Sequence, residues 1–168
     1  TSVTGIENIG GTLLYNDTLT GDNNANKIYG YGGNDSLYGL GGVDTIFGDT
    51  GNDNIYTGTG IGDVALGEGG TDTLYGNFDS DFLIGGIVSS TLIEDLDLDW
   101  INLTSTTAGV ILDLSTTVTA GTGVYAGSYS QALVVDATPL DNADNTQFDY
   151  IRQIEHIIGS TGDDTFTG

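Results

Sequence analysis

The stretch "YGYGGNDSLYGLGGVDTIFGDTGNDNI", residues 29–55, repeats itself every nine residues. Each copy carries two or three glycines, one aspartate and, two residues after the aspartate, a large aliphatic side chain. The same register continues on both sides of this stretch, with one extra residue before Leu74. The aliphatic column is Leu19, Ile28, Leu37, Ile46, Ile55, Val64, Leu74 and Leu83. Three columns that stay in register over eight copies predict a structural repeat.

A period of nine residues indicates β structure. It is too short for a helical repeat and fits a turn of about six residues followed by a strand of about three, whose central side chain points to one side. Two such units form one coil, so two short parallel sheets face each other across a line of Leu, Ile and Val. Glycine supplies the positive φ angles that tight turns demand. We therefore expect an all-β protein with a parallel β-roll over residues 15–86.

The excess of negative charge indicates that such a roll requires bound cations. The chain has 24 acidic side chains against two basic ones, Lys27 and Arg152, and a formal net charge of −22. Two carboxylates about 5 Å apart repel by roughly 3 kcal/mol at an effective dielectric constant of about 20. Salt bridges cannot offset this repulsion, so we expect bound cations to supply the missing positive charge.

The same composition excludes several classes of function. There is no basic patch for nucleic acid, and no apolar run is long enough to predict a membrane span. The absence of cysteine excludes disulfides and thiolate metal sites. With His156 as the one histidine and no Gly-x-Ser-x-Gly motif, no catalytic triad can be assembled, so we expect a protein that is not an enzyme. A structural or surface role is expected for His156.

Aspartates beside glycine-rich turns, without histidine or cysteine nearby, form the oxygen donor set that Ca²⁺ prefers. In a two-sheet coil these aspartates fall on two edges, and we expect several Ca²⁺ ions between successive turns. One edge carries Asp17, Asp35, Asp53 and Asp72; the other carries Asn26, Asp44, Asp63 and Asp81. The second edge is expected to bind more weakly, because Asn26 is neutral and the carboxylate expected at position 62 has slipped to Asp63.

The copies "GYGGNDSLY", "GLGGVDTIF", "GDTGNDNIY" and "GEGGTDTLY" resemble the RTX, or hemolysin-type, calcium-binding nonapeptide G-G-x-G-x-D-x-U-x. The match covers about half of the chain, residues 15–86, and recurs in "GSTGDDTFTG" at the C-terminal end. The resemblance implies a parallel β-roll in which aspartate side chains and turn carbonyls coordinate Ca²⁺. It also implies an extracellular bacterial protein, exported by a type I system and folded by calcium outside the cell.

Carried onto this sequence, the resemblance implies two kinds of ligand. The carboxylate ligands would be Asp35, Asp44, Asp53, Asp72, Asp81 and, in the last copy, Asp164. The carbonyl ligands would come from Gly30, Gly32, Gly33, Gly39, Gly41, Gly42, Gly48, Gly51, Gly67, Gly69 and Gly70.

The sequence departs from the RTX pattern in two ways. Its second glycine is replaced by Tyr31, Leu40, Asp49 and Glu68, which requires these residues to adopt a suitable φ. In "TGTGIGDVA", residues 57–65, the register fails, which argues against a regular site there.

The two ends of the chain are alike. "IENIGGTLLYNDTLTG" (6–21) resembles "IEHIIGSTGDDTFTG" (154–168). We therefore expect a lead-in over 1–14, the roll over 15–86, a β-rich flanking segment over 87–153, and a second lead-in with the start of a further repeat over 154–168, all within an excerpt of a longer polypeptide. The alternating pattern in "LDLDWINL", together with "GVILDLS" (109–115) and "ALVVDA" (132–137), predicts strands that cover an open end or face of the roll.

Two functions are consistent with these features. The first is a calcium-binding RTX module that serves a secreted protein as a structural, secretion-linked element. The alternative is an adhesive or S-layer module that binds a glycan or neighbouring subunits through Ca²⁺. The aromatic column after the aliphatic one leaves both open, because outward rings can stiffen a sheet or bind sugars. That column consists of Tyr29, Tyr38, Phe47, Tyr56 and Tyr75.

Overall fold

The computed structural model describes residues 5–76, 81–86, 100–102, 109–120, 127–135, 148–152, 156–159 and 165–167. Side chains are described for residues 5–76, 81–86, 100–102 and 156–159. None of these residues form a helix long and apolar enough to cross a membrane.

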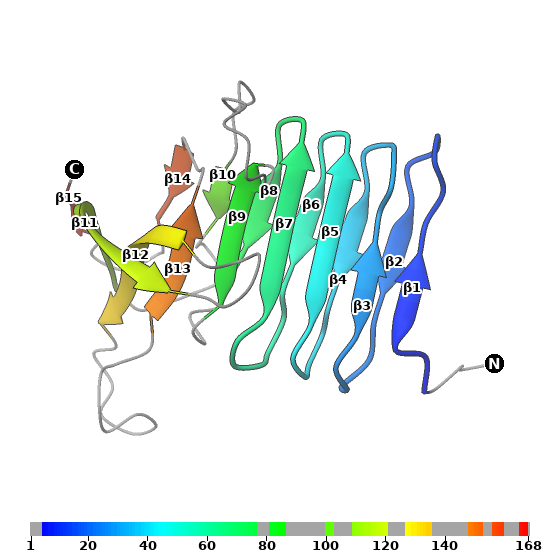
Figure 1. Ribbon diagram of the computed structural model, residues 1–168, viewed down its shortest axis with the longest axis horizontal. Helices are drawn as coiled ribbons and strands as arrows, with labels where there is room; N and C mark the ends of the chain where they lie inside the picture. The colour runs from blue at the N-terminus through cyan, green and yellow to red at the C-terminus, as the bar shows by residue number, and fades with distance from the viewer. Residues whose placement is uncertain are drawn as a thin grey trace.

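The described residues form two β-sheets (Figure 1). The first sheet contains, in spatial order, β1 (Asn8–Gly10), β3 (Lys27–Tyr29), β5 (Thr45–Thr50), β7 (Val64–Gly69), β9 (Phe82–Gly86), β13 (Phe148–Arg152), β12 (Gly127–Val135), β11 (Gly109–Ala120) and β15 (Thr165–Thr167). The second contains β14 (His156–Ile158), β10 (Trp100–Asn102), β8 (Thr73–Tyr75), β6 (Asn54–Tyr56), β4 (Ser36–Tyr38) and β2 (Thr18–Thr20).

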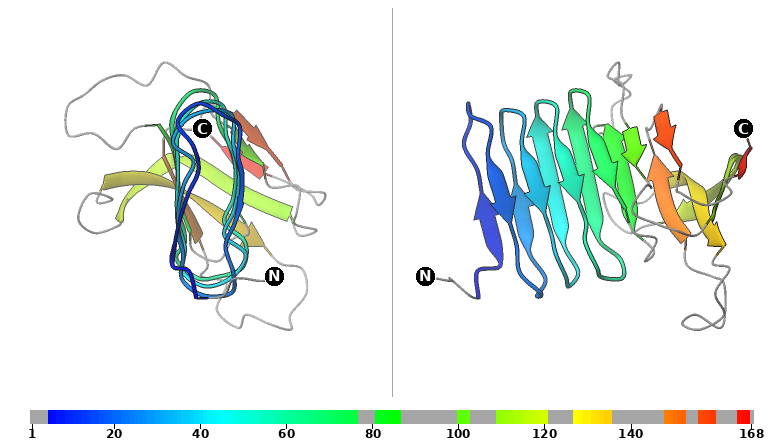
Figure 2. Two further views of the ribbon diagram at one scale, coloured as in Figure 1. Left: turned by 90° about the vertical axis from the view of Figure 1, so that its right-hand side faces the viewer. Right: turned by 180° about the vertical axis from the view of Figure 1, so that it is seen from behind.

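From β1 to β9 the chain alternates between the two sheets, and each strand pairs in parallel with the next strand but one. Viewed along the long axis, the successive coils superpose as a flattened loop (Figure 2). The predicted all-β parallel β-roll is therefore confirmed. Strands β5 and β7 are longer than predicted, with six residues each, because their pairing continues into the turn as far as Thr50 and Gly69.

The core is a single file of aliphatic side chains between the sheets. Only the central residue of each three-residue strand points inward, so each strand contributes one side chain. The fully buried members are Ile28, Leu37, Ile46, Ile55, Ala65, Leu74, Leu83 and Ile101, with Ile9, Leu19 and Ile157 packed at the ends. Seven of the eight predicted core positions belong to this set, including Leu19, which is only partly buried. The exception is Val64.

The prediction that Val64 occupies the core is wrong. Ala65 pairs with Ile46 and is fully buried, whereas Val64 packs against a second apolar cluster around Leu66 and Ile84. The extra residue lies in the turn between β6 and β7, and not in the turn that directly precedes Leu74. This longer turn absorbs the insertion, and the strand that follows returns to register.

Both sheets continue beyond the nonapeptide block. β10 pairs with β8 in parallel and places Ile101 in the core, and β14 pairs in turn with β10. β13 adds in parallel to β9, after which β12 and β11 continue the first sheet in antiparallel order. The strands predicted within 109–115 and 132–137 coincide with or overlap β11 and β12. Residues 96–99 of the alternating segment lie outside the described residues.

Because the core is a single file, each buried aliphatic side chain contributes strongly to the free energy of unfolding. We expect Ile46→Ala to lower the free energy of unfolding by about 2–5 kcal/mol, because neighbouring coils cannot collapse into the space. Val43→Ala removes an exposed valine from the same repeat and should change it by less than about 0.5 kcal/mol. Urea denaturation at a fixed, saturating calcium concentration would measure both, and equal effects would contradict the packing described.

Candidate metal centre

The aspartates of the repeat stack into two ladders along the two edges of the roll. In each ladder, the backbone N–H of one residue donates to Oδ1 of the aspartate one coil further on. In the first ladder, these bonds run from Asp17 to Asp35, from Asp35 to Asp53 and from Asp53 to Asp72, at 2.8, 2.7 and 2.8 Å. In the second, they run from Asn26 to Asp44, from Asp44 to Asp63 and from Asp63 to Asp81, at 2.8, 2.7 and 2.9 Å.

The second carboxylate oxygen, Oδ2, is buried in both ladders. Asp35, Asp44 and Asp53 are at most 1% exposed, and their Oδ2 atoms are buried without a hydrogen-bond donor. The Oδ2 atoms of Asp63, Asp72 and Asp81 are buried as well. A buried anionic oxygen without a partner is strongly unfavourable unless a positive charge lies beside it.

Other oxygen atoms crowd the same place. A Cβ atom added to Gly30 would lie 2.5 Å from Asp35 Oδ2 and 2.7 Å from the carbonyl oxygen of Gly48 in the next coil. The same arrangement recurs at Gly39, Gly48 and Gly67. At these four turns, the opening glycine thus leaves the space of a side chain to a carboxylate oxygen and a carbonyl oxygen. Oxygen donors of these two kinds suit a hard cation such as Ca²⁺.

The turn backbone is held in left-handed conformations at two positions. Tyr31, Leu40, Asp49 and Glu68 have φ between 70° and 76°, although none of them is glycine. Two residues later, Gly33, Gly42, Gly51 and Gly70 have φ between 108° and 135°. The substitutions for the second glycine of the pattern are therefore accommodated, with strain that the surrounding coils must outweigh.

The turn at residues 57–63, where the register was expected to fail, carries a regular aspartate. Asp63 is fully buried and joins the second ladder through Asp44 and Asp81. The turn accommodates its additional residue before Asp63, where Ile61 is exposed. The aspartate thus keeps its place in the ladder, while the turn itself differs from the others, with positive φ at Gly58 and Gly62.

The remaining predicted ligands are distributed as follows. Asp17 and Asn26 occupy the first turn of each ladder and accept hydrogen bonds from their own turns. The carbonyl of Gly69 accepts a hydrogen bond of 2.7 Å from Gly51 N. Asp164 lies outside the described residues. In the described part of the chain, no three His, Cys, Asp or Glu side chains gather into a metal site, so a cation here depends on backbone carbonyls.

Sequence reasoning missed an asparagine ladder directly before the first aspartate ladder. Asn34 N donates to Asn16 Oδ1 at 2.8 Å, and Asn52 N donates to Asn34 Oδ1 at 3.0 Å. Thr71 N continues the series by donating to Asn52 Oδ1. The signal was present as asparagine on every second copy, at 16, 34 and 52. These bonds fix the spacing of the turns on that edge.

The outward aromatic rings form separate ladders on the two sheets. On the second sheet Tyr38, Tyr56 and Tyr75 stack with centroids 4.6 and 4.1 Å apart. On the first, Tyr29 stacks on Phe47 at 4.9 Å, and Lys27 Nζ lies 5.4 Å from both centroids. Sugars stack on ring faces, and both faces of Tyr56 are covered by its neighbours. This geometry favours a sheet-stiffening role. His156 stacks on Trp100 at 4.2 Å, consistent with the structural role expected for it.

Three comparisons bear on the identity of this arrangement. The sequence profile of the RTX calcium-binding nonapeptide repeat matches the chain in four copies, over residues 13–46, 38–60, 57–92 and 153–168. These matches cover more than half of the chain, which therefore belongs to the family of RTX calcium-binding nonapeptide-repeat proteins. Its repeats form a calcium-binding β-roll module.

The search of curated proteins found no match. Among solved structures, the chain is similar to the solution structure of the AlgE6R3 subunit from the Azotobacter vinelandii mannuronan C5-epimerase. The identity is 18%, the alignment covers 89% of this chain and 78% of that chain, and the TM-score is 0.30.

Gly30 and Gly41 allow a matched test of the turn geometry, since neither has a positive φ. Gly30→Ala should destabilise the protein by about 1–3 kcal/mol, because its Cβ would collide with Asp35 Oδ2 and Gly48 O. Gly41→Ala meets its nearest atom, the side-chain oxygen of Asn23, at 3.3 Å and should cost less than about 1 kcal/mol. Thermal denaturation in calcium would measure the difference; a Gly41→Ala variant as unstable as Gly30→Ala would contradict it.

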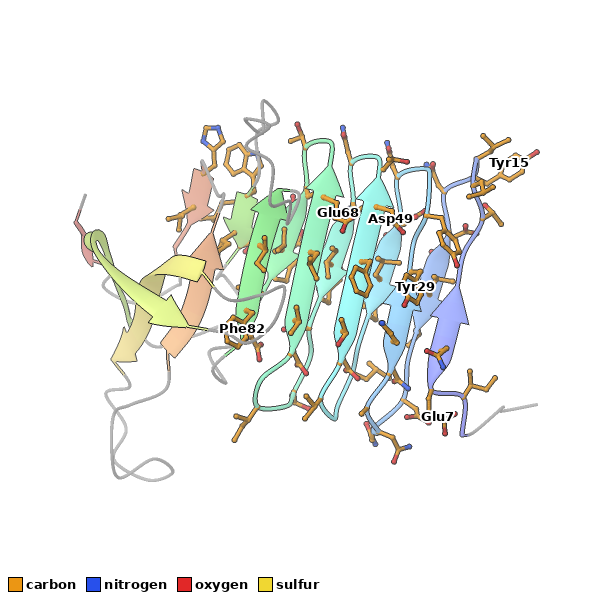
Figure 3. All side chains as sticks on the ribbon, in the orientation of Figure 1. Glu7, Tyr15, Tyr29, Asp49, Glu68 and Phe82 are labelled. Carbon is orange, nitrogen blue, oxygen red and sulfur yellow. The ribbon has the colours of Figure 1, made fainter. Side chains whose placement is uncertain are left out.

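Burial is the main cause that raises the pKa of three ladder aspartates, Asp35, Asp44 and Asp53. It raises the pKa of Asp53 to about 6, with the charges of Asp35 and Asp49 adding to the effect and the hydrogen bond from Asp35 opposing it. It also raises the pKa of Asp35 and of Asp44. Glu68 lies beside Asp49 on neighbouring strands (Figure 3), and burial followed by its hydrogen bond to Asp49 raises its pKa to about 7.

These shifts predict that, in calcium-depleted buffer, the folded state is more stable at acidic than at neutral pH. Because the folded-state pKa values lie above the unfolded ones, the folded chain binds more protons between about pH 4 and 7, and its stability falls as the pH rises through that window. Circular dichroism should show more β structure at pH 4.5 than at pH 7.5, with sedimentation to exclude aggregates. Glu68→Gln should flatten the upper part of the profile. Greater β content at the higher pH would contradict the assignment.

Proposed function

We propose that this chain is a non-enzymatic calcium-binding module of a secreted bacterial protein, which folds when it meets extracellular Ca²⁺. The observation that carries this proposal is the set of buried carboxylate oxygens of Asp35, Asp44 and Asp53, which receive no hydrogen bond from the chain. Without a cation, the stacked turns would hold unscreened negative charge inside the fold.

The ligands proposed for the ions come from neighbouring turns of one edge. Each site would combine aspartate carboxylates with carbonyls of the glycine-rich turns, including those that the RTX pattern indicates from Gly30 to Gly70. The aspartates would be those of the two ladders and, in the last copy, Asp164. Several ions are expected, because each ladder contains more than one pair of successive turns.

Calcium binding and folding are then one equilibrium. The unfolded chain does not bring turns from different coils together, so the ion binds only the coiled state, and its binding free energy becomes folding free energy. A site that is occupied at about 100 times its dissociation constant contributes about 2.7 kcal/mol. The single-file aliphatic core requires such a contribution, since it buries few side chains for the length of backbone that it orders.

The alternative function, an adhesive or S-layer module, would need a surface for a glycan or a neighbouring subunit. The acidic faces and the tyrosine column suggested it, and the ring faces of Tyr38, Tyr56 and Tyr75 are turned toward one another. No described feature favours a glycan over sheet stiffening, so the folding module is the function proposed.

A calcium titration followed by far-UV circular dichroism tests the proposal. At neutral pH the chain should be largely unfolded in chelator and become β-rich on addition of Ca²⁺. Asp53→Asn should raise the calcium midpoint by about tenfold, because it removes a ligand charge. Glu7→Gln removes the same charge from an exposed position and should leave the midpoint within about twofold. A spectrum already β-rich in chelator and unchanged by Ca²⁺ would contradict calcium-triggered folding.

The same titration tests the extracellular setting. Calcium sites of extracellular modules have dissociation constants of about 10⁻⁴ to 10⁻³ M, well above those of cytosolic calcium buffers. A folding midpoint in that range would keep the chain unfolded before export and fold it afterwards. A midpoint in the nanomolar range would contradict a secretion-linked role while leaving calcium binding intact.

A further inference from the structure

The first turn of the first aspartate ladder differs from the later ones. Asp17 Oδ2 accepts two hydrogen bonds from Thr12, one from its backbone N at 2.6 Å and one from its Oγ1 at 2.9 Å. The corresponding oxygens of Asp35 and Asp53 are buried and accept none. Asp17 therefore has from its own turn the donors that its successors lack.

The second ladder begins in the same way. Asn26 is 4% exposed, and its Oδ1 accepts a hydrogen bond of 2.7 Å from Asp22 N. Its Nδ2 donates to the carbonyl oxygen of Ile6 at 3.1 Å. A carboxylate could accept the first bond but could not donate the second. The oxygen and the nitrogen of the neutral amide thus each have a hydrogen-bond partner.

The backbone conformation separates the same two turns from the rest. Thr12 and Asp22 stand at the second position of their turns and do not have a positive φ, whereas Tyr31, Leu40 and Asp49 at the equivalent positions are left-handed. In the first turns, the N–H at this position reaches the side chain of Asp17 or Asn26. In the turns that end at Asp35, Asp44 and Asp53, Oδ2 receives no such bond.

We infer that the first coil is a calcium-independent cap, in which donors from Thr12, Asp22 and Asn26 take the place of the cation. This inference rests on the proposed binding of Ca²⁺ by the inner turns. It reassigns Asp17 and Asn26, which the spacing of the sequence places among the ligands, to the end of the roll. Calcium sites then begin with the turns of Asp35 and Asp44.

The cap also orients the first calcium ligands. The backbone N–H of Asp17 donates to Asp35 Oδ1 at 2.8 Å, and that of Asn26 donates to Asp44 Oδ1 at 2.8 Å. Within the coiled state, a coil whose own acceptors are satisfied positions these two carboxylates for the first ions.

Calcium stoichiometry and affinity, measured by isothermal titration calorimetry on the whole chain, test this inference. Asp17→Asn should bind as many ions as the wild type with affinity within about twofold, whereas Asp53→Asn should lose at least one ion or about tenfold in affinity. Asn26→Asp, which restores the carboxylate of the RTX pattern, should add no ion and should raise the calcium midpoint for folding, because it sets a charge against the Ile6 carbonyl.

Several outcomes would overturn the cap. Asp17→Asn could lose the same number of ions as Asp53→Asn, or Asn26→Asp could gain an ion. A wild-type chain that binds no calcium would instead contradict the proposed function. Amide hydrogen exchange at Thr12 and Asp22 would then test whether the first coil forms without calcium. Exchange at both amides should be at least about tenfold slower than in an unstructured peptide, and the Asp17→Ala variant should exchange faster at Thr12. Unprotected amides at both positions in the wild type would also overturn it.

Discussion

The structure depends on the electrostatics of stacked, buried carboxylates. A parallel roll brings equivalent residues of successive coils to within one strand spacing, about 4.8 Å, so a conserved position within the repeat becomes a continuous column in space. When that position is aspartate, the column is a line of negative charge inside the protein. One oxygen of each carboxylate accepts a hydrogen bond from the neighbouring coil. At Asp35, Asp44 and Asp53 the other oxygen is buried beside the glycine that opens the turn, where a carbonyl oxygen of the next coil also lies. Under the proposed function a cation occupies that side, and the ligand then becomes a part of the core.

This explains why so thin an apolar core can suffice. The aliphatic file contributes one side chain per strand, and the turns include non-glycine residues held at left-handed φ. Both features cost stability that an ordinary globular domain would not accept. Under the proposed function, ion binding adds to the folding free energy and offsets these costs. The asparagine ladder and the tyrosine stacks add contacts between successive coils.

The ends of such a roll present a separate problem. If Ca²⁺ binds between successive turns, an inner coil can share ions with both neighbours, whereas the first described coil pairs with a coil on one side only. At the N-terminal end, the donors to Asp17 and Asn26 come from the chain itself. At the other end, β13 and β10 extend the two sheets past the last regular repeats. The first coil therefore satisfies its own side-chain acceptors by hydrogen bonds, whereas added strands extend the sheets at the other end.

A fixed local period is enough to predict the repeat, the facing parallel sheets, the two aspartate edges and nearly all of the core file. Other features depend on how the coils pack in three dimensions. The tertiary structure showed that the turn before Asp63 absorbs the extra residue, so that Ala65 replaces Val64 in the core. It brought Ile101 into register after a long interruption, where no spacing predicted a partner. It also distinguished Asp17 and Asn26 from their successors, because a hydrogen bond depends on where a donor lies in space and not on the interval at which residues recur.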